Sequence, residues 1–105
     1  MVVISSHPKT KLKQELKDYG FQEFFIDING GVHDKIKTIK QIMKKNRFKA
    51  ATTAYIGDMI HDIKAGKKAG VTTIAISRGY QTKKELLSQN PDFLINSLKG
   101  LKKIS

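Results

Sequence analysis

The stretch AYIGDMIHDIKAGKKAG, residues 54–70, decides the fold of this chain. An apolar run ends at Gly57, and two aspartates follow it, Asp58 and Asp62. The apolar run is typical of a buried strand, and the residues after Asp58 favour a helix that closes at Gly70. Two carboxylates therefore stand at the point where a strand is expected to end and a helix to begin.

The same alternation of apolar and amphipathic runs covers the rest of the 105-residue chain. Strands are expected at 2–5, 24–28, 52–57, 71–77 and 93–95. Helices are expected from Pro8 to Tyr19, around Ile36–Met43, at 59–69, from a Thr82–Glu85 capping box onward, and from Ser97 onward. Strands that alternate with helices indicate an α/β fold with a mainly parallel sheet. No internal boundary is visible, so residues 1–105 are expected to form one domain.

The chain is strongly basic, with 20 Lys and Arg residues against 9 Asp and Glu residues and a formal net charge of +11. Such a charge is compatible with nucleic acid, an anionic membrane or phosphorylated small molecules as partners. The basic residues are almost all lysines, and they are scattered over every expected helix. Scattered lysines are typical of solvated helix faces, so the charge does not favour nucleic acid as a partner.

Cysteine is absent, which excludes disulfides and thiolate metal sites. The apolar run at residues 2–5 is too short for a signal peptide or a membrane span. We therefore expect a cytoplasmic protein that has no membrane partner.

Polar side chains stand at or near the carboxyl ends of four expected strands: Ser5, Asp27, Asp58 and Ser77. In parallel α/β folds these ends share one edge of the sheet, and ligands bind beyond it. Asp58 and Asp62 would supply the hard oxygen ligands that Mg²⁺ prefers. The alternative is structural, with Asp58 as a helix cap and Asp62 as a solvated helix residue.

The segment YIGDMIHDIKAGKKAGVTTIAISRGYQTKKELLSQNPDFLINSL, residues 55–98, resembles the end of a haloacid-dehalogenase-superfamily phosphatase of the phosphoglycolate-phosphatase-like branch. Upstream, VVISSHP is similar to the second motif of this family, an apolar strand that ends in Ser or Thr. HDKIKTIKQIM is similar to the region of the third motif, where a lysine opens a helix. The resemblance covers essentially the whole chain and implies a Rossmann-like core of three layers around a mainly parallel sheet.

The resemblance implies a role in phosphoryl transfer for each matching residue. Ser5, with Ser6 beside it, would bind the transferring phosphoryl group, and Lys35 would neutralise its charge and orient the nucleophile. Asp58 would ligate Mg²⁺, and Asp62 would support the metal directly or through water. These roles suit a reaction that depends on positioning and on charge neutralisation.

Each assignment has an alternative that the residues themselves leave open. Ser5 can bond the local backbone. Lys35 can be one more solvated lysine, and Lys37 competes with it for the same role. Arg78, after the fourth strand, is a weaker candidate for a contact with substrate. Three histidines lack the spacing of metal ligands and are expected in loops or at the surface: His7, His33 and His61.

The nucleophile of the family is an aspartate in a D-x-D motif that follows an earlier strand, and this chain has no such motif. The cap domain of the family has no counterpart either, so the chain resembles the second half of a phosphatase. In the family the absent strand is central, between the strands expected here at 2–5 and 52–57. These two strands then either pair directly or leave a slot for a strand-donating partner.

The sequence therefore predicts part of a Mg²⁺-dependent phosphatase for small phosphomonoesters, with little or no turnover by this chain alone. Whether the chain is an enzyme by itself stays open. The alternatives are a non-enzymatic phosphatase-like binding module, a subunit of a split enzyme and, more weakly, a basic nucleic-acid-binding protein.

Overall fold

The computed structural model describes residues 2–5, 17–18, 20, 22–25, 32–77, 81–96 and 100. Its strands are β1 (Val2–Ser5), β2 (Gln22–Phe25), β3 (Thr53–Gly57), β4 (Thr72–Ile76) and β5 (Phe93–Ile95). Its helices are α2 (Val32–Asn46), α3 (Ile60–Ala69) and α4 (Lys83–Leu87), and a short 3-10 helix, η1, covers Ala50–Thr52.

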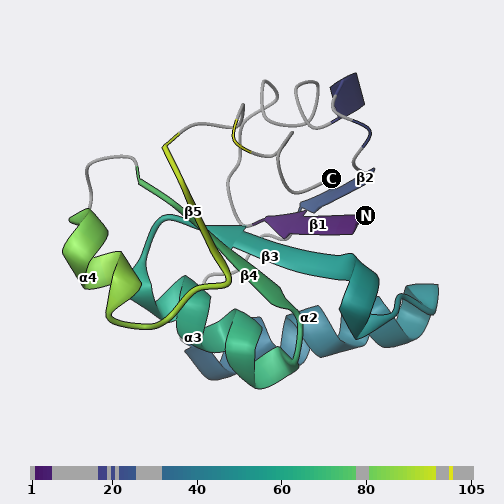
Figure 1. Ribbon diagram of the computed structural model, residues 1–105. Coiled ribbons are helices and arrows are strands. Elements are labelled where there is room, and N and C mark those ends of the chain that lie inside the picture. The colour runs from purple at the N-terminus through teal and green to yellow at the C-terminus, as the bar shows by residue number, and fades with distance from the viewer. Residues whose placement is uncertain are drawn as a thin grey trace.

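The described strands form one parallel sheet in the order β2-β1-β3-β4-β5. α2 and α3 pack against each other on the same side of this sheet (Figure 1). The predicted α/β class with a parallel sheet is confirmed. Because all these strands run in the same direction, their carboxyl ends share one edge, and β1 and β3 reach it at Ser5 and Gly57.

β1 pairs directly with β3, in a register that runs from Val2↔Thr53 to Ser5↔Ile56. The chain thus adopts the first of the two arrangements that the sequence left open, and these two strands leave no gap between them. Direct pairing satisfies backbone groups that are costly to leave unbonded in the interior. It also places Ser5 one strand spacing away from the end of β3.

Side chains on both faces of β1, β3 and β4 are buried, as is typical of parallel sheets. Side chains alternate between the two faces along each strand, and Ile4 and Tyr55 face the helices, where they form a cluster with Ile39 and Ala65. Buried residues that alternate with this set are Val3, Ala54, Ile56, Ile74 and Ile76. A core on both sides explains why the strands are continuous apolar runs in the sequence.

A second apolar cluster joins α4 to the rest of the fold. Leu86 of α4 is fully buried beside Ile63 of α3 and Ala75 of β4. This contact fixes the start of α4 close to the start of α3, which matters for the site described below. None of the described helices combines the length and the apolar character that crossing a membrane requires.

Some predicted boundaries differ from the structure. The second strand begins at Gln22 rather than at residue 24. β2 lies at an edge of the sheet, where polar residues are tolerated, so hydrophobicity alone did not reveal its start. The fourth strand, expected at 71–77, is one residue shorter at each end. α3 closes at Gly70 as expected, with a left-handed φ of 83°.

Other predictions fall on residues outside those described. They are most of the helix expected from Pro8, the end of the second strand with Asp27, and the helix expected from Ser97. Of the first helix, the described Lys17 and Asp18 are helical, and Gly20 follows with a φ of 84°.

The capping box predicted at the start of α4 is present. Thr82 Oγ1 accepts a hydrogen bond from the Glu85 backbone N–H at 3.0 Å. In return, the Glu85 carboxylate accepts one from the Thr82 backbone N–H at 3.1 Å. The box satisfies two amides of the first turn that have no partner within the helix.

We expect this box to make the first turn of α4 sensitive to acid. The Thr82 backbone N–H, followed by the Thr82 hydroxyl, lowers the pKa of Glu85 below its usual 4.5. A carboxylate with a depressed pKa contributes stability that is present above the unfolded-state value and is lost as the pH falls through the lowered value. An NMR pH titration of the Glu85 side chain measures the shift. Thr82→Ala should move the midpoint back toward 4.5, and a midpoint at or above that value in the unmodified chain would contradict the prediction.

Candidate functional site

Gly57 ends β3 and allows the Asp62 side chain to lie directly against the backbone. A Cβ placed on Gly57 would come within 2.2 Å of the Asp62 Cβ and 2.5 Å of its Oδ2. Any side chain at this position would therefore displace the Asp62 carboxylate. The glycine and the second aspartate of the G-D-x-x-x-D pattern form one packing unit, which accounts for their spacing.

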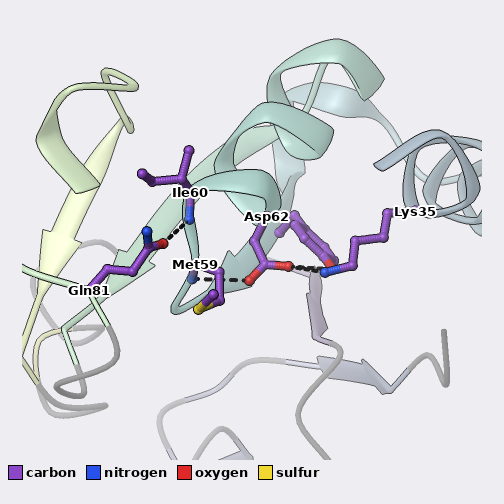
Figure 2. A network of polar contacts seen from close by, with 6 residues as sticks. Lys35, Met59, Ile60, Asp62 and Gln81 are labelled. Atoms are coloured by element: carbon purple, nitrogen blue, oxygen red, sulfur yellow. Dashed lines mark hydrogen bonds and ion pairs between the residues drawn. The ribbon is translucent and has the colours of Figure 1, made fainter. Parts of the chain in front are cut away.

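The Asp62 carboxylate is the centre of a network of polar contacts (Figure 2). Its Oδ1 accepts a hydrogen bond from Lys35 Nζ at 2.6 Å and a longer one from the Tyr55 hydroxyl at 3.4 Å. Its Oδ2 accepts one from the Met59 backbone N–H at 3.2 Å. Both oxygens are thus engaged by the protein, and the side chain is only 4% exposed.

Lys35 comes from the first turn of α2 and reaches across to α3. Its side chain is 10% exposed, so its charge is largely removed from water and depends on the ion pair with Asp62. Lys37, the competing candidate from the sequence, is exposed on the outside of α2. The structure therefore brings Lys35 to the carboxyl edge of the sheet and leaves Lys37 in solvent.

Asp58 follows Gly57 in the loop between β3 and α3, and it is 8% exposed. The cap position of α3 is occupied by Met59 rather than Asp58, so simple helix capping by Asp58 is not what the structure shows. Burial of a carboxylate is costly unless it has compensating partners. An aspartate just after a strand, at the edge where parallel sheets bind ligands, is a candidate for a functional role.

Ser5 is fully buried at the end of β1, beside Ile56 of β3. By strand alternation it belongs to the face opposite Tyr55, so Ser5 and the Lys35–Asp62 pair share the edge but approach it from different faces. His61 is half-buried in α3, and Ser77 follows β4. Three predicted candidates lie outside the described residues: Ser6, His7 and Arg78. For His33 only the backbone, within α2, is described.

Two side chains that make polar contacts around this site were not predicted from the sequence. Tyr55 is 1% exposed, and its hydroxyl reaches Asp62; its place two residues before Gly57, on the same face of β3, was a usable signal. Gln81 accepts a hydrogen bond from the Ile60 backbone N–H through its side-chain oxygen. No periodicity links residues 60 and 81, so nothing in the sequence pointed to this contact.

The carboxylates at this edge fit a Mg²⁺ site only in part. Asp58 offers the kind of carboxylate that Mg²⁺ binds, whereas both oxygens of Asp62 already accept hydrogen bonds from the protein. Within the part of the chain that the structure describes, no three or more His, Asp or Glu residues gather closely enough to hold a metal. Mg²⁺ commonly keeps several waters and binds through one or two carboxylates together with substrate phosphate, which is the environment that Asp58 can offer.

Comparisons with known proteins agree with this architecture. The chain is 28% identical over 106 residues to a phosphoglycolate phosphatase from Vibrio parahaemolyticus and 29% identical over 108 residues to one from Pseudomonas syringae pv. tomato. These matches cover 96% of this chain but only 46% and 39% of the two relatives, so the chain spans less than half of their length.

The fold and the sequence point to the same family. A solved structure of a haloacid dehalogenase-like family hydrolase from Streptococcus pneumoniae matches 98% of this chain and 50% of its own, with a TM-score of 0.64 at 14% identity. That likeness shows the fold alone. The family model of haloacid dehalogenase-like hydrolases matches residues 1–76. Because this match runs from the strand that ends in Ser5 to the end of β4, the chain belongs to the haloacid dehalogenase-like hydrolase family.

Proposed function

We propose that this chain supplies the metal-binding and phosphate-binding side of a Mg²⁺-dependent phosphatase for small phosphomonoesters. The observation that carries the proposal is the buried ion pair of Lys35 and Asp62, together with the buried Asp58 in the loop that leads into the helix of Asp62. It lies at the edge of the sheet where parallel α/β folds bind ligands. The relatives named phosphoglycolate phosphatase support the substrate class.

Among the described residues, Lys35 is a cation that this edge can offer to a phosphoryl group. An ammonium has three donors, so one can hold Asp62 while the others face phosphate oxygens. Ser5 and Ser6 would add hydroxyl donors, and Asp62 would keep the ammonium in place. Asp58 would bind Mg²⁺, which neutralises phosphoryl charge when it is present.

The carboxylates of this site are poorly placed to attack phosphorus. Asp62 is committed to Lys35, Tyr55 and the Met59 backbone, and Asp58 is assigned to the metal. A nucleophile has to come from another segment or from another chain. We therefore expect little or no hydrolysis of p-nitrophenyl phosphate by these 105 residues alone.

A strand-donating partner is one source of that nucleophile. A strand that entered between β1 and β3 would deliver the residues at its end to the same edge. Its entry would have to break the pairing from Val2↔Thr53 to Ser5↔Ile56. Loss of the NMR contacts between β1 and β3 on formation of an active complex would support this route, and their persistence would contradict it.

The proposed metal role is tested with Mn²⁺ as a paramagnetic probe, in the presence of inorganic phosphate. We expect Asp58→Asn to weaken Mn²⁺ binding about tenfold or more. Asp34→Asn is the matched control, since Asp34 is an exposed aspartate in the first turn of α2. Equal affinity in the two variants would refute the role of Asp58.

The prediction that this chain lacks a nucleophile has a test of its own. Mg²⁺-dependent hydrolysis of p-nitrophenyl phosphate by the unmodified chain, lost in Asp58→Asn, would refute that prediction.

A further inference from the structure

The side chain of Gln81 connects the start of α4 to the loop that carries Asp58. Its Oε1 accepts a hydrogen bond from the Ile60 backbone N–H at 2.5 Å, across 21 residues of sequence. Figure 2 shows the amide reaching the first residue of α3 from the opposite side to Lys35. Gln81 is half-buried, so water competes with this bond less than at a fully exposed site.

The start of α3 needs such an outside acceptor. The first amides of a helix have no partner within the helix, and a side-chain oxygen at the cap position usually accepts one of them. Here the cap residue is Met59, whose side chain makes no capping hydrogen bond. Asp62 accepts from the Met59 N–H and Gln81 accepts from the Ile60 N–H. Two consecutive amides directly after Asp58 are thus held by side chains.

Gln81 directly precedes the capping box of α4. Its amide helps to lower the pKa of the Glu85 carboxyl, and Glu85 is fixed by the capping box with Thr82. Leu86 anchors the same turn in the apolar cluster with Ile63 of α3. The connection therefore runs from the packed first turn of α4 through Gln81 to the loop that follows β3.

We propose that Gln81 is a positioning residue that fixes the loop Asp58–Ile60 and thereby aims the Asp58 carboxylate at the carboxyl edge of the sheet. Gln81 acts through the Ile60 backbone and does not touch substrate or metal. The effect on the loop follows from the contacts alone, whereas the effect on metal binding rests on the proposed role of Asp58.

Amide hydrogen exchange tests the effect on the loop. Gln81→Ala should speed exchange of the Ile60 amide about fivefold to tenfold, because it removes one net hydrogen bond. Gln81→Glu keeps an oxygen at the same reach and should retain slow exchange. Gln89→Ala, a half-buried glutamine just after α4, is the matched control and should leave Ile60 unchanged. Unchanged exchange in Gln81→Ala, or equal acceleration in the control, would overturn the proposal.

Mn²⁺ affinity tests whether the loop aims Asp58. Loss of a contact that orients a metal ligand without touching the metal typically weakens metal affinity by about tenfold or more. Gln81→Ala should therefore weaken Mn²⁺ binding by about tenfold, and a cooperative urea unfolding transition should show that the variant is still folded. Faster Ile60 exchange with unchanged Mn²⁺ affinity would overturn the positioning of Asp58. If the unmodified chain binds no Mn²⁺, the metal site of the proposed function is refuted. The Ile60 exchange rate, together with the change in the NMR chemical shift of the Asp58 backbone amide in Gln81→Ala, then still decides whether Gln81 fixes the loop.

Discussion

Lys35→Met should lower the free energy of unfolding by about 3 kcal/mol, because it leaves the buried Asp62 carboxylate without its cation. The two charges lie 2.6 Å apart, and both side chains are at most 10% exposed. Removal of one member of such a pair leaves an uncompensated charge in the interior, which costs more than the intact pair contributes. Urea denaturation followed by far-UV circular dichroism measures the change.

Lys37→Met is the matched control for this prediction. It makes the same chemical change two residues away, at an exposed position of α2, and should alter stability by less than about 0.5 kcal/mol. The double variant Lys35→Met with Asp62→Asn should lose less stability than the sum of the losses in the two single variants, because the two residues are in direct contact. Similar losses at positions 35 and 37 would mean that the buried ion pair does not form in solution.

Gly57→Ala should lower the free energy of unfolding by about 3 kcal/mol, at the upper end of the range for overpacking a well-packed core. The added Cβ would overlap the Asp62 Cβ and Cγ, at 2.2 and 2.4 Å. Asp62 cannot withdraw easily, since its carboxylate is held by Lys35 and by the Met59 N–H. Thermal and urea unfolding measure the loss, and the Lys35 ammonium should become more exposed to solvent.

Gly66→Ala provides the comparison, because it also adds a methyl group at a close contact. Its Cβ would meet the Thr73 Cγ2 at 2.7 Å, but alanine gains about 1 kcal/mol over glycine within a helix. The loss should therefore be clearly smaller than that of Gly57→Ala. The reverse order would show that the approach of Asp62 to the backbone at Gly57 is not the tight contact that the structure describes.

Much of the architecture follows from local sequence patterns. The apolar run before Gly57 and the amphipathic residues up to Gly70 predicted β3 and α3 to within a residue or two, because burial on both faces makes a parallel strand continuously apolar. The start of β2 was missed for the opposite reason. Gln22 and Glu23 lie in an edge strand, where the chain does not need apolar residues.

The candidate site was predictable where it depends on helix geometry. Lys35 stands one turn before Ile39, so it belongs to the inward side of α2, whereas Lys37 does not. That periodicity distinguishes the two lysines and could have been used from the start. The contact of Gln81 with Ile60 could not be predicted, because it depends on how two loops meet in space. The direct pairing of β1 with β3 is likewise a choice between arrangements that the sequence allowed.

The direct pairing of β1 with β3 has a consequence for assembly kinetics. The register from Val2↔Thr53 to Ser5↔Ile56 closes the sheet within this chain. A partner strand that arrives after folding meets bonds that must first open, whereas one that is present during folding competes with them as they form. If the proposed strand-donating partner exists, synthesis of this chain together with that partner should give more complex than mixing the two after each has folded. Because β1 and β3 can pair within this chain, the amount of complex would depend on whether the partner is present before folding, as well as on its affinity.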